Sequence, residues 1–138
     1  MSQNWEPPPL LELESVSVPE EHEIIFRSTR LFLTSVEVWN TMIVVHIVEA
    51  VAETARGRNA ESILMLSAKD QNGVVYGARG SGTTSNGAGS PGVCNFFLDR
   101  PVGSEPAGGR LTLVAEGFNN RPDEELVTVS LAPRRHRP

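Results

Sequence analysis

The 138-residue chain has very few of the residues on which several kinds of protein chemistry depend. Cys94 is the only cysteine, so no disulfide can form within the chain and no cysteine-based zinc motif is present. A lone cysteine is typical of a reducing compartment, and the first residues lack the basic and apolar regions of a secretory signal. No apolar run approaches the roughly 18 residues of a membrane span, since the best one, residues 42–48, is interrupted by His46. These absences predict a cytoplasmic protein that does not enter a membrane.

Lysine is nearly absent, and the charges that are present are unevenly placed. The net charge is −5, with six acidic residues and no Lys or Arg in residues 1–23, while Arg134, Arg135 and Arg137 lie at the C-terminus. Binding to nucleic acid needs clustered cations that release counterions from phosphates, and an acidic chain without a basic stripe lacks them. We therefore expect no nucleic-acid partner. The basic end is interpreted as a solvated tail, with a contact to an anion as the alternative.

The spacings that metal ions and nucleophilic catalysis require are missing. His22, His46 and His136 are far apart, so we expect no metal site and no cofactor. On a strand over residues 42–48, His46 faces outward if its apolar neighbours face the core, which favours a solvent-facing or hydrogen-bonded histidine. The residues around Cys94 do not resemble a cysteine-hydrolase signature, and a cysteine in an apolar strand usually fills a small space in the core. No catalytic residue is assigned, and an enzyme is the least favoured class.

Prolines and glycines, by contrast, are plentiful, and they divide the chain into three parts. Residues 1–22 hold Pro7-Pro8-Pro9 and spread carboxylates, which predict an extended, acidic, Pro-rich leader that is partly disordered. The β-sandwich domain is predicted at residues 23–132, and a basic tail at residues 133–138. Within the leader, Val16 and Val18 are placed so that they could form an edge strand.

Short β-prone runs separated by turn signals fill the predicted domain. Asn40-Thr41 links two runs as a hairpin, and Asn72-Gly73 tolerates the positive φ angles of a tight turn. Residues 49–61 favour no more than one turn, and no amphipathic helix alternates with the runs, which argues against a parallel α/β fold. The pattern predicts an all-β fold, a single antiparallel β-sandwich of seven or eight strands. The runs lie at residues 24–26, 31–39, 42–48, 63–68, 74–76, 93–98, 111–116 and 126–131.

A glycine-rich stretch at residues 77–92 is interpreted as a long connecting loop. It contains six glycines and Pro91, and fixing so much glycine in a packed element costs too much entropy. The stretch has neither the spacing of a phosphate-binding P-loop nor the third glycine of the dinucleotide fingerprint, and it holds no Gly-x-Ser-x-Gly. Tyr76 and Arg79, beside this loop, are candidate partner-binding residues.

Six segments follow one another in a characteristic order. They are Arg27-Ser28-Thr29, Val36-Glu37-Val38-Trp39, Asp70-Gln71-Asn72-Gly73, residues 77–92, Phe96-Phe97-Leu98 with Pro101, and Leu111-Thr112-Leu113-Val114-Ala115-Glu116. This order resembles that of a group of uncharacterised small actinobacterial β-sandwich proteins. The resemblance covers about residues 24–131 and implies an Ig-like sandwich, but it implies no activity. Gly117-Phe118 stands where the group often has Trp-Pro.

Three classes of function are open at this point. The leading hypothesis is a non-enzymatic module that binds another protein through a sheet edge, long loops or the termini. Trp5 has little domain to pack against and is a candidate anchor for a partner groove, together with Tyr76 and Arg79. The second hypothesis is a sandwich that binds a small ligand or carbohydrate with the loop at residues 77–92. The third is a homo-oligomeric structural component built by edge pairing.

Overall fold

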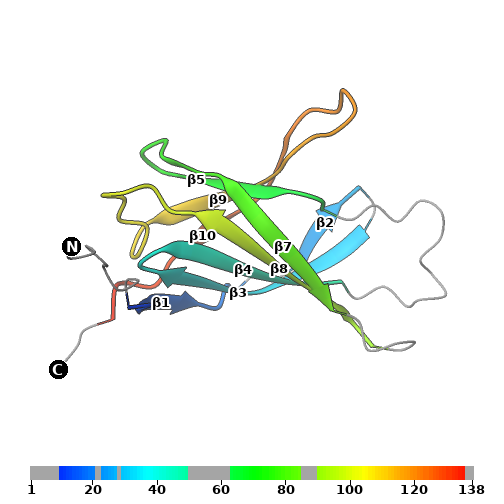
Figure 1. Cartoon of the computed structure of the whole chain (residues 1–138). Coiled ribbons are helices and arrows are strands. Elements are labelled where there is room, and N and C mark those ends of the chain that lie inside the picture. Colours follow the sequence, from blue (N-terminus) through cyan, green and yellow to red (C-terminus); the bar gives the residue numbers. More distant parts are fainter. Residues whose placement is uncertain (1–9, 21–22, 28, 50–62, 85–89, 136–138) are drawn as a thin grey trace, which may run out of the picture.

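Two antiparallel β-sheets packed face to face make up the computed structural model of the protein (Figure 1). The structure describes residues 10–20, 23–27, 29–49, 63–84 and 90–135. These residues form ten strands and no helix, which confirms the predicted all-β antiparallel sandwich but gives more strands than the seven or eight expected. The strands are β1 (Leu13–Ser17), β2 (Glu23–Phe26), β3 (Thr29–Trp39), β4 (Met42–Glu49), β5 (Leu66–Asp70), β6 (Val75–Tyr76), β7 (Ala78–Thr84), β8 (Gly92–Asp99), β9 (Arg110–Ala115) and β10 (Glu124–Ser130).

The strands of each sheet come from distant parts of the chain. Sheet A has six strands in the order β1-β3-β4-β8-β7, with β2 paired to the first half of β3, and sheet B has four in the order β10-β9-β5-β6. The chain crosses between the sheets after β4, after β6 and after β8. The predicted hairpin at Asn40-Thr41 is confirmed, since β3 and β4 pair there with Val38 opposite Ile43.

The hydrophobic core lies between the two sheets because alternate side chains of each strand point inward. Cys94 of β8 belongs to this core and is 7% exposed, as expected for a small core residue. Fully burying a large aliphatic side chain contributes about 1.5–3 kcal/mol, so the core stabilises the fold without a disulfide. The largest fully buried side chains are Tyr76, Leu31, Leu33, Ile43, Ile47, Leu66, Leu98, Leu111, Leu113, Val36, Val38 and Val45.

The first strand begins inside the segment predicted to be the leader. β1 pairs with the second half of β3, so an edge strand is present where Val16 and Val18 suggested one. Glu14 of β1 is only 5% exposed. The folded sandwich therefore starts before the predicted boundary at residue 23. The proline run at residues 7–9 lies outside the described residues, as do residues 50–62.

The glycine-rich stretch contains a strand, so its interpretation as a loop is wrong for residues 78–84. β7 pairs with β8 from Ala78 opposite Leu98 to Thr84 opposite Val93. The edge of β8 would be open without β7, and its backbone N–H and C=O groups form the hydrogen bonds that hold β7 as a strand. This tertiary pairing outweighs the weak intrinsic strand preference of glycine. β1 and β7 account for the two strands beyond the eight expected from the sequence.

The turn predicted at Asn72-Gly73 is confirmed. Gly73 has a φ of 81°, in the left-handed region that glycine adopts without strain. The side chain of Asp70 closes the turn, since its Oδ1 accepts hydrogen bonds from the backbone N–H groups of Asn72 at 2.8 Å and Val74 at 3.0 Å.

Candidate functional site

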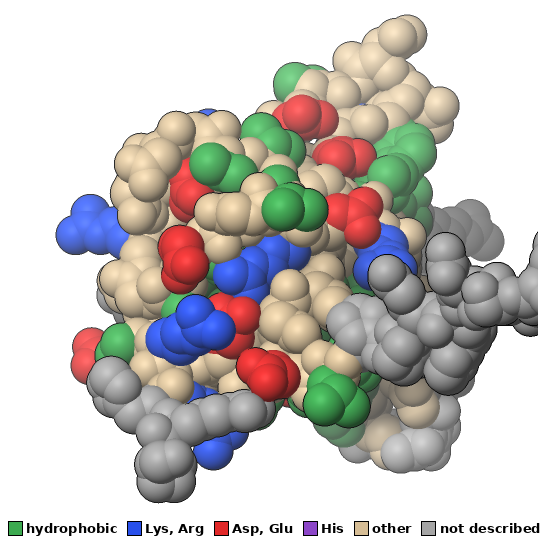
Figure 2. All heavy atoms as spheres, turned by 60° about the vertical axis from the view of Figure 1, so that its left-hand side comes forward, with side chains coloured by type: hydrophobic (Ala, Val, Ile, Leu, Met, Phe, Trp, Pro, Cys, Tyr) green, Lys and Arg blue, Asp and Glu red, His purple; other side chains and the backbone are tan. Residues whose placement is uncertain are grey.

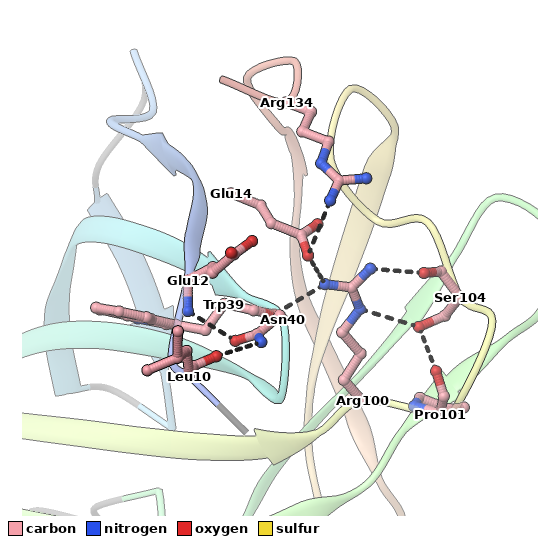
Figure 3. A network of polar contacts seen from close by, with 9 residues as sticks. All are labelled: Leu10, Glu12, Glu14, Trp39, Asn40, Arg100, Pro101, Ser104 and Arg134. Atoms are coloured by element: carbon pink, nitrogen blue, oxygen red, sulfur yellow. Dashed lines mark hydrogen bonds and ion pairs between the residues drawn. The ribbon is translucent and has the colours of Figure 1, made fainter. Parts of the chain in front are cut away.

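A buried ion pair connects three distant segments at one end of the sandwich (Figure 3). Arg100 follows β8, and its side chain is 9% exposed. Its Nη1 donates to Glu14 Oε2 at 2.7 Å and to the carbonyl oxygen of Trp39 at 2.8 Å, while Nη2 donates to the carbonyl oxygen of Ser104 at 2.7 Å. Arg134 approaches the same carboxylate, with Nη2 at 4.0 Å from Glu14 Oε2. The guanidinium thus fastens β1, the end of β3 and the turn after β8 to one another.

This network holds the fold together and is not a candidate reactive site. The buried carboxylate faces two cations, and the buried cation faces a carboxylate and two carbonyl groups, so the charges compensate one another inside the fold. The backbone N–H of Arg135 donates to the carbonyl oxygen of Glu14 at 2.7 Å, which ties the C-terminal segment to β1. Figure 2 brings this end of the molecule forward and shows acidic and basic side chains interspersed on its surface.

Tyr76, a candidate binding residue in the sequence analysis, lies in the core with 0% of its surface exposed. Its hydroxyl donates to Asp70 Oδ2 at 3.2 Å. Burial is the main cause that raises the pKa of Tyr76 above its ordinary value of 10.0. A side chain without exposed surface cannot contact a partner, so Tyr76 is a core residue and not part of a binding surface.

The other two candidates do not join Tyr76 in a common site. Arg79 lies on β7 with its side chain 54% exposed, and its Nε is 3.7 Å from Asp99 Oδ1. Trp5 lies outside the described residues. A ligand site made from Tyr76, Arg79 and a flexible 77–92 loop is therefore not assembled by the described part of the chain.

The outer face of sheet A carries a groove of about 290 Å³ that the sequence analysis did not identify. We call it the outer groove. It crosses β3, β4 and β8, and Val44, at 7% exposed, lies at its floor. Apart from Leu11, which precedes β1, its apolar residues occupy the positions of these strands that alternate with core residues, and only the register of the three strands brings them together. The lining residues are Leu11, Glu37, Trp39, Thr41, Met42, Val44, His46, Asn95 and Phe97.

Four polar side chains of the outer groove are bonded to one another, whereas the buried Oγ1 of Thr41, which also lines the groove, has no hydrogen-bond partner in the described chain. His46 faces outward, and its Nε2 lies 2.8 Å from Glu37 Oε2 and its Nδ1 lies 2.5 Å from Asn95 Oδ1, which confirms the expected hydrogen-bonded histidine. Trp39 Nε1 donates to the other carboxylate oxygen of Glu37 at 2.9 Å. Because these four groups partner one another, the groove offers an occupant a mainly apolar surface, with the hydroxyl of Thr41 as a polar group that is still unpaired. Among the described residues, no cluster of three or more His, Cys, Asp or Glu side chains could hold a metal ion.

The second candidate surface is the outer edge of β7, which we call the β7 edge. Six of the seven residues of β7 are exposed, and β7 is the last strand in the order of sheet A. A pocket of about 170 Å³ lies beside it, between β7 and the segment that leads into β5. Leu64 and Met65, which line this pocket, are 63% and 38% exposed. Phe96 of β8 also lines it and is 3% exposed, so the pocket reaches down to the hydrophobic core.

Comparisons of the chain with protein-family models, with curated proteins and with solved structures gave no match. Within the described residues there is no helix with the length and apolarity needed to cross a membrane. The outer groove and the β7 edge are therefore the two candidate surfaces of the described chain.

Proposed function

We propose that this protein is a non-enzymatic, cytoplasmic protein-binding module built on an Ig-like β-sandwich, and that it binds an extended segment of a partner at the β7 edge. The strand order supports the Ig-like assignment. The order β3-β4-β8-β7 corresponds to strands A-B-E-D of the immunoglobulin fold, and β10-β9-β5-β6 corresponds to G-F-C-C′. The resemblance to small actinobacterial sandwich proteins points to the same architecture.

The open backbone of β7 is the observation that carries this proposal. Within the described residues β7 pairs only with β8, so its other edge presents N–H and C=O groups without a strand partner. Native proteins usually protect such an edge with lysine, proline or a very short strand. From Gly80 to Thr84 the register is regular, and this stretch contains neither lysine nor proline. Gly80 and Gly82 also carry no side chain that could lean over this edge, and the space on their face of the sheet is open, since nothing lies within 4 Å of a Cβ built at either position.

A strand added at this edge would be recognised through its alternate side chains. Ser81 lies opposite Phe96, a core residue, so side chains on the Ser81 face of the sheet point into the space between the two sheets. On that side an incoming side chain would meet Leu64 and Met65. A cavity of about 150 Å³ holds benzene, and the pocket here, at about 170 Å³, is large enough for one aliphatic or aromatic side chain. We therefore expect an extended partner segment with apolar residues at alternating positions.

Selection from a displayed library of random peptides tests the proposal with the full-length protein. We expect the selected peptides to alternate apolar and polar residues and to lose binding to Ser81→Lys, because this substitution puts a charge into the entrance of the pocket. Inward-pointing charges protect natural sheet edges in the same way. Thr84→Lys is the matched control, since it adds the same charge to the same strand on the opposite face and should preserve binding. Selected peptides that bind Ser81→Lys as well as wild type would contradict the proposal.

Pairing of β7 with β7 of a second copy is a second candidate for the same edge. The same unpaired backbone supports it, because two antiparallel edges can complete one another's hydrogen bonds. Light scattering over a concentration series distinguishes the two candidates. Binding of a separate partner predicts a monomer at all concentrations, whereas self-pairing predicts a dimer that Ser81→Lys dissociates and Thr84→Lys preserves.

A further inference from the structure

Side chains of three neighbouring strands form the floor and the sides of the outer groove. Val44 of β4 lies at the floor, paired in register with Phe97 of β8 on one side, and Trp39 of β3 lies on the other. β3 and β8 are two strand spacings apart, or about 10 Å, so the two aromatic side chains border the groove on opposite sides of β4. The Trp39 ring is held in place, because its Nε1 donates to Glu37 Oε1 at 2.9 Å.

The rim of the groove beside Trp39 is also fixed. Asn40, in the turn between β3 and β4, makes two side-chain hydrogen bonds there: Nδ2 donates to the carbonyl oxygen of Leu10 at 2.8 Å, and Oδ1 accepts from the N–H of Glu12 at 2.9 Å. Leu11, between these two residues, lines the groove. Figure 3 shows Leu10 beside Trp39 and Asn40 at this corner. The described walls therefore keep their shape without a ligand, so binding costs little ordering of the chain.

The charges in the described lining favour a neutral ligand. Its two ionisable side chains, Glu37 and His46, pair with one another, with Oε2 and Nε2 at 2.8 Å. The other carboxylate oxygen of Glu37 accepts from Trp39, and the second ring nitrogen of His46 lies against Asn95 Oδ1. An ionic ligand would lose its hydration in this groove without gaining an unpaired counter-charge, which is unfavourable.

Thr41 gives the groove a polar group that lacks a partner. This residue lines the groove at the turn before β4, and its Oγ1 is buried and has no hydrogen-bond partner in the described chain. Buried polar groups of native proteins are nearly always hydrogen-bonded, because an unpaired one is destabilising. A rotation about χ1 between staggered positions can turn the hydroxyl toward an occupant of the groove. A ligand with one hydrogen-bonding group would therefore satisfy it.

We propose that the outer groove binds a neutral molecule of two fused aromatic rings, with one polar group that hydrogen-bonds to the hydroxyl of Thr41. A cavity of about 150 Å³ holds benzene, and the groove, at about 290 Å³, is roughly twice as large. Aromatic side chains such as Trp39 and Phe97 favour contacts with other aromatic rings. This inference goes beyond the function proposed for the β7 edge and does not depend on it, because it concerns another surface of sheet A.

Titration of the full-length protein with 2-naphthol and with naphthalene tests the proposal. The two probes share one ring system, and only 2-naphthol has a hydroxyl. Amide chemical shifts in NMR spectra give the dissociation constant of each probe and locate its site, which we expect over β3, β4 and β8. In Thr41→Val, which keeps the shape of the side chain, naphthalene should still bind. The preference for 2-naphthol over naphthalene should fall by about fivefold or more, because the hydroxyl of the probe is then buried without a partner.

Matched variants keep the test decisive. Thr84→Val makes the same change on the outer face of sheet A but outside the groove, and should leave the preference unchanged. Phe97→Ala should weaken both probes at least tenfold, whereas Phe32→Ala, which alters an outward residue of β3 outside the groove, should not. The urea midpoint of Thr41→Val should not be lower than that of the wild type, because the hydroxyl has no partner to lose.

Three results would overturn the proposal. The first is an equal preference for 2-naphthol in the wild type and in Thr41→Val, since the hydroxyl then takes no part in recognition. The second is binding that shifts amides elsewhere in the sandwich or that Phe97→Ala leaves unchanged. The third is the absence of any shift with 2-naphthol at millimolar concentration.

Discussion

Replacing Arg100 by methionine should destabilise the protein more than any other single change of a charged residue described above. The side chains of Arg100 and Glu14 are 9% and 5% exposed, and their contact is 2.7 Å long. Arg100→Met preserves much of the side-chain volume but leaves the Glu14 carboxylate buried and leaves the carbonyl group of Trp39 without this donor. Removing one partner of a buried ion pair costs about 3–5 kcal/mol, and the remaining cation near Glu14, the exposed Arg134 at 4.0 Å, compensates only part of the charge that Arg100 leaves. In a domain of this size the loss corresponds to a decrease in Tm of about 10 °C or more.

Urea unfolding of the single variants and of the double variant provides the assay. Glu14→Leu alone should also be strongly destabilising, because it leaves the Arg100 cation without its carboxylate. The double variant Glu14→Leu/Arg100→Met should be more stable than the sum of the two single losses predicts, since a methionine and a leucine can pack where two charges faced one another. The difference between the sum and the double variant measures the coupling between the two residues.

An exposed ion pair is the control for this prediction. The side chains of Lys69 and Glu125 are 48% and 63% exposed, and their contact is 2.6 Å long. This distance is about the same as that between Arg100 and Glu14, but the Lys69–Glu125 pair is surrounded by solvent. Lys69→Met should therefore change the free energy of unfolding by no more than about 1 kcal/mol. The reasoning is refuted if Arg100→Met costs as little as Lys69→Met, or if the losses from the Arg100 and Glu14 substitutions are additive.

Two more predictions concern other parts of the fold. Tyr76 is the only tyrosine in the chain, so tyrosinate absorbance in the near ultraviolet reports its ionisation alone. Burial raises the pKa of Tyr76, so the neutral hydroxyl contributes stability to the folded protein. This contribution is fully present below pH 10.0, the ordinary pKa, and is lost as the pH rises toward the raised pKa. Titration of Tyr76 in the folded protein at its ordinary pKa would contradict this prediction. Gly117→Ala should cost about 1–3 kcal/mol in urea unfolding, because its Cβ would lie 1.9 Å from the carbonyl oxygen of Arg121. Gly77→Ala, with nothing within 4 Å of its Cβ, is the control, and equal losses for both variants would contradict the steric argument.

The features that sequence analysis predicted correctly depend on local signals. Asn40-Thr41 and Asn72-Gly73 mark turns by their own backbone preferences, and the alternation around His46 assigns its side chain to the outer face. The alternating apolar residues of β9 likewise predicted a strand whose inward side chains, Leu111 and Leu113, are buried. Each of these inferences needs only neighbouring residues, which is why the sequence supports them.

The features that sequence analysis missed depend on contacts between distant residues. For β1, the sequence indicated only that Val16 and Val18 could form an edge strand; it did not show that Glu14 is buried there and compensated by Arg100, 86 residues further along the chain. β7 is rich in glycine and becomes a strand through its pairing with β8. The outer groove exists only because the registers of β3, β4 and β8 align their outward side chains, and no local pattern reveals such a register. Both candidate surfaces are therefore products of tertiary pairing.

Residue-resolved amide hydrogen exchange of the wild type, with and without a selected alternating peptide, tests the central claim most directly. Addition of a strand at the β7 edge predicts slower exchange at every second amide of β7, because in an edge strand alternate N–H groups face the open side. The protection should be absent in Ser81→Lys and retained in Thr84→Lys. Peptide binding that protects amides elsewhere in the sandwich and leaves those of β7 unchanged would contradict the claim that this edge is the recognition surface.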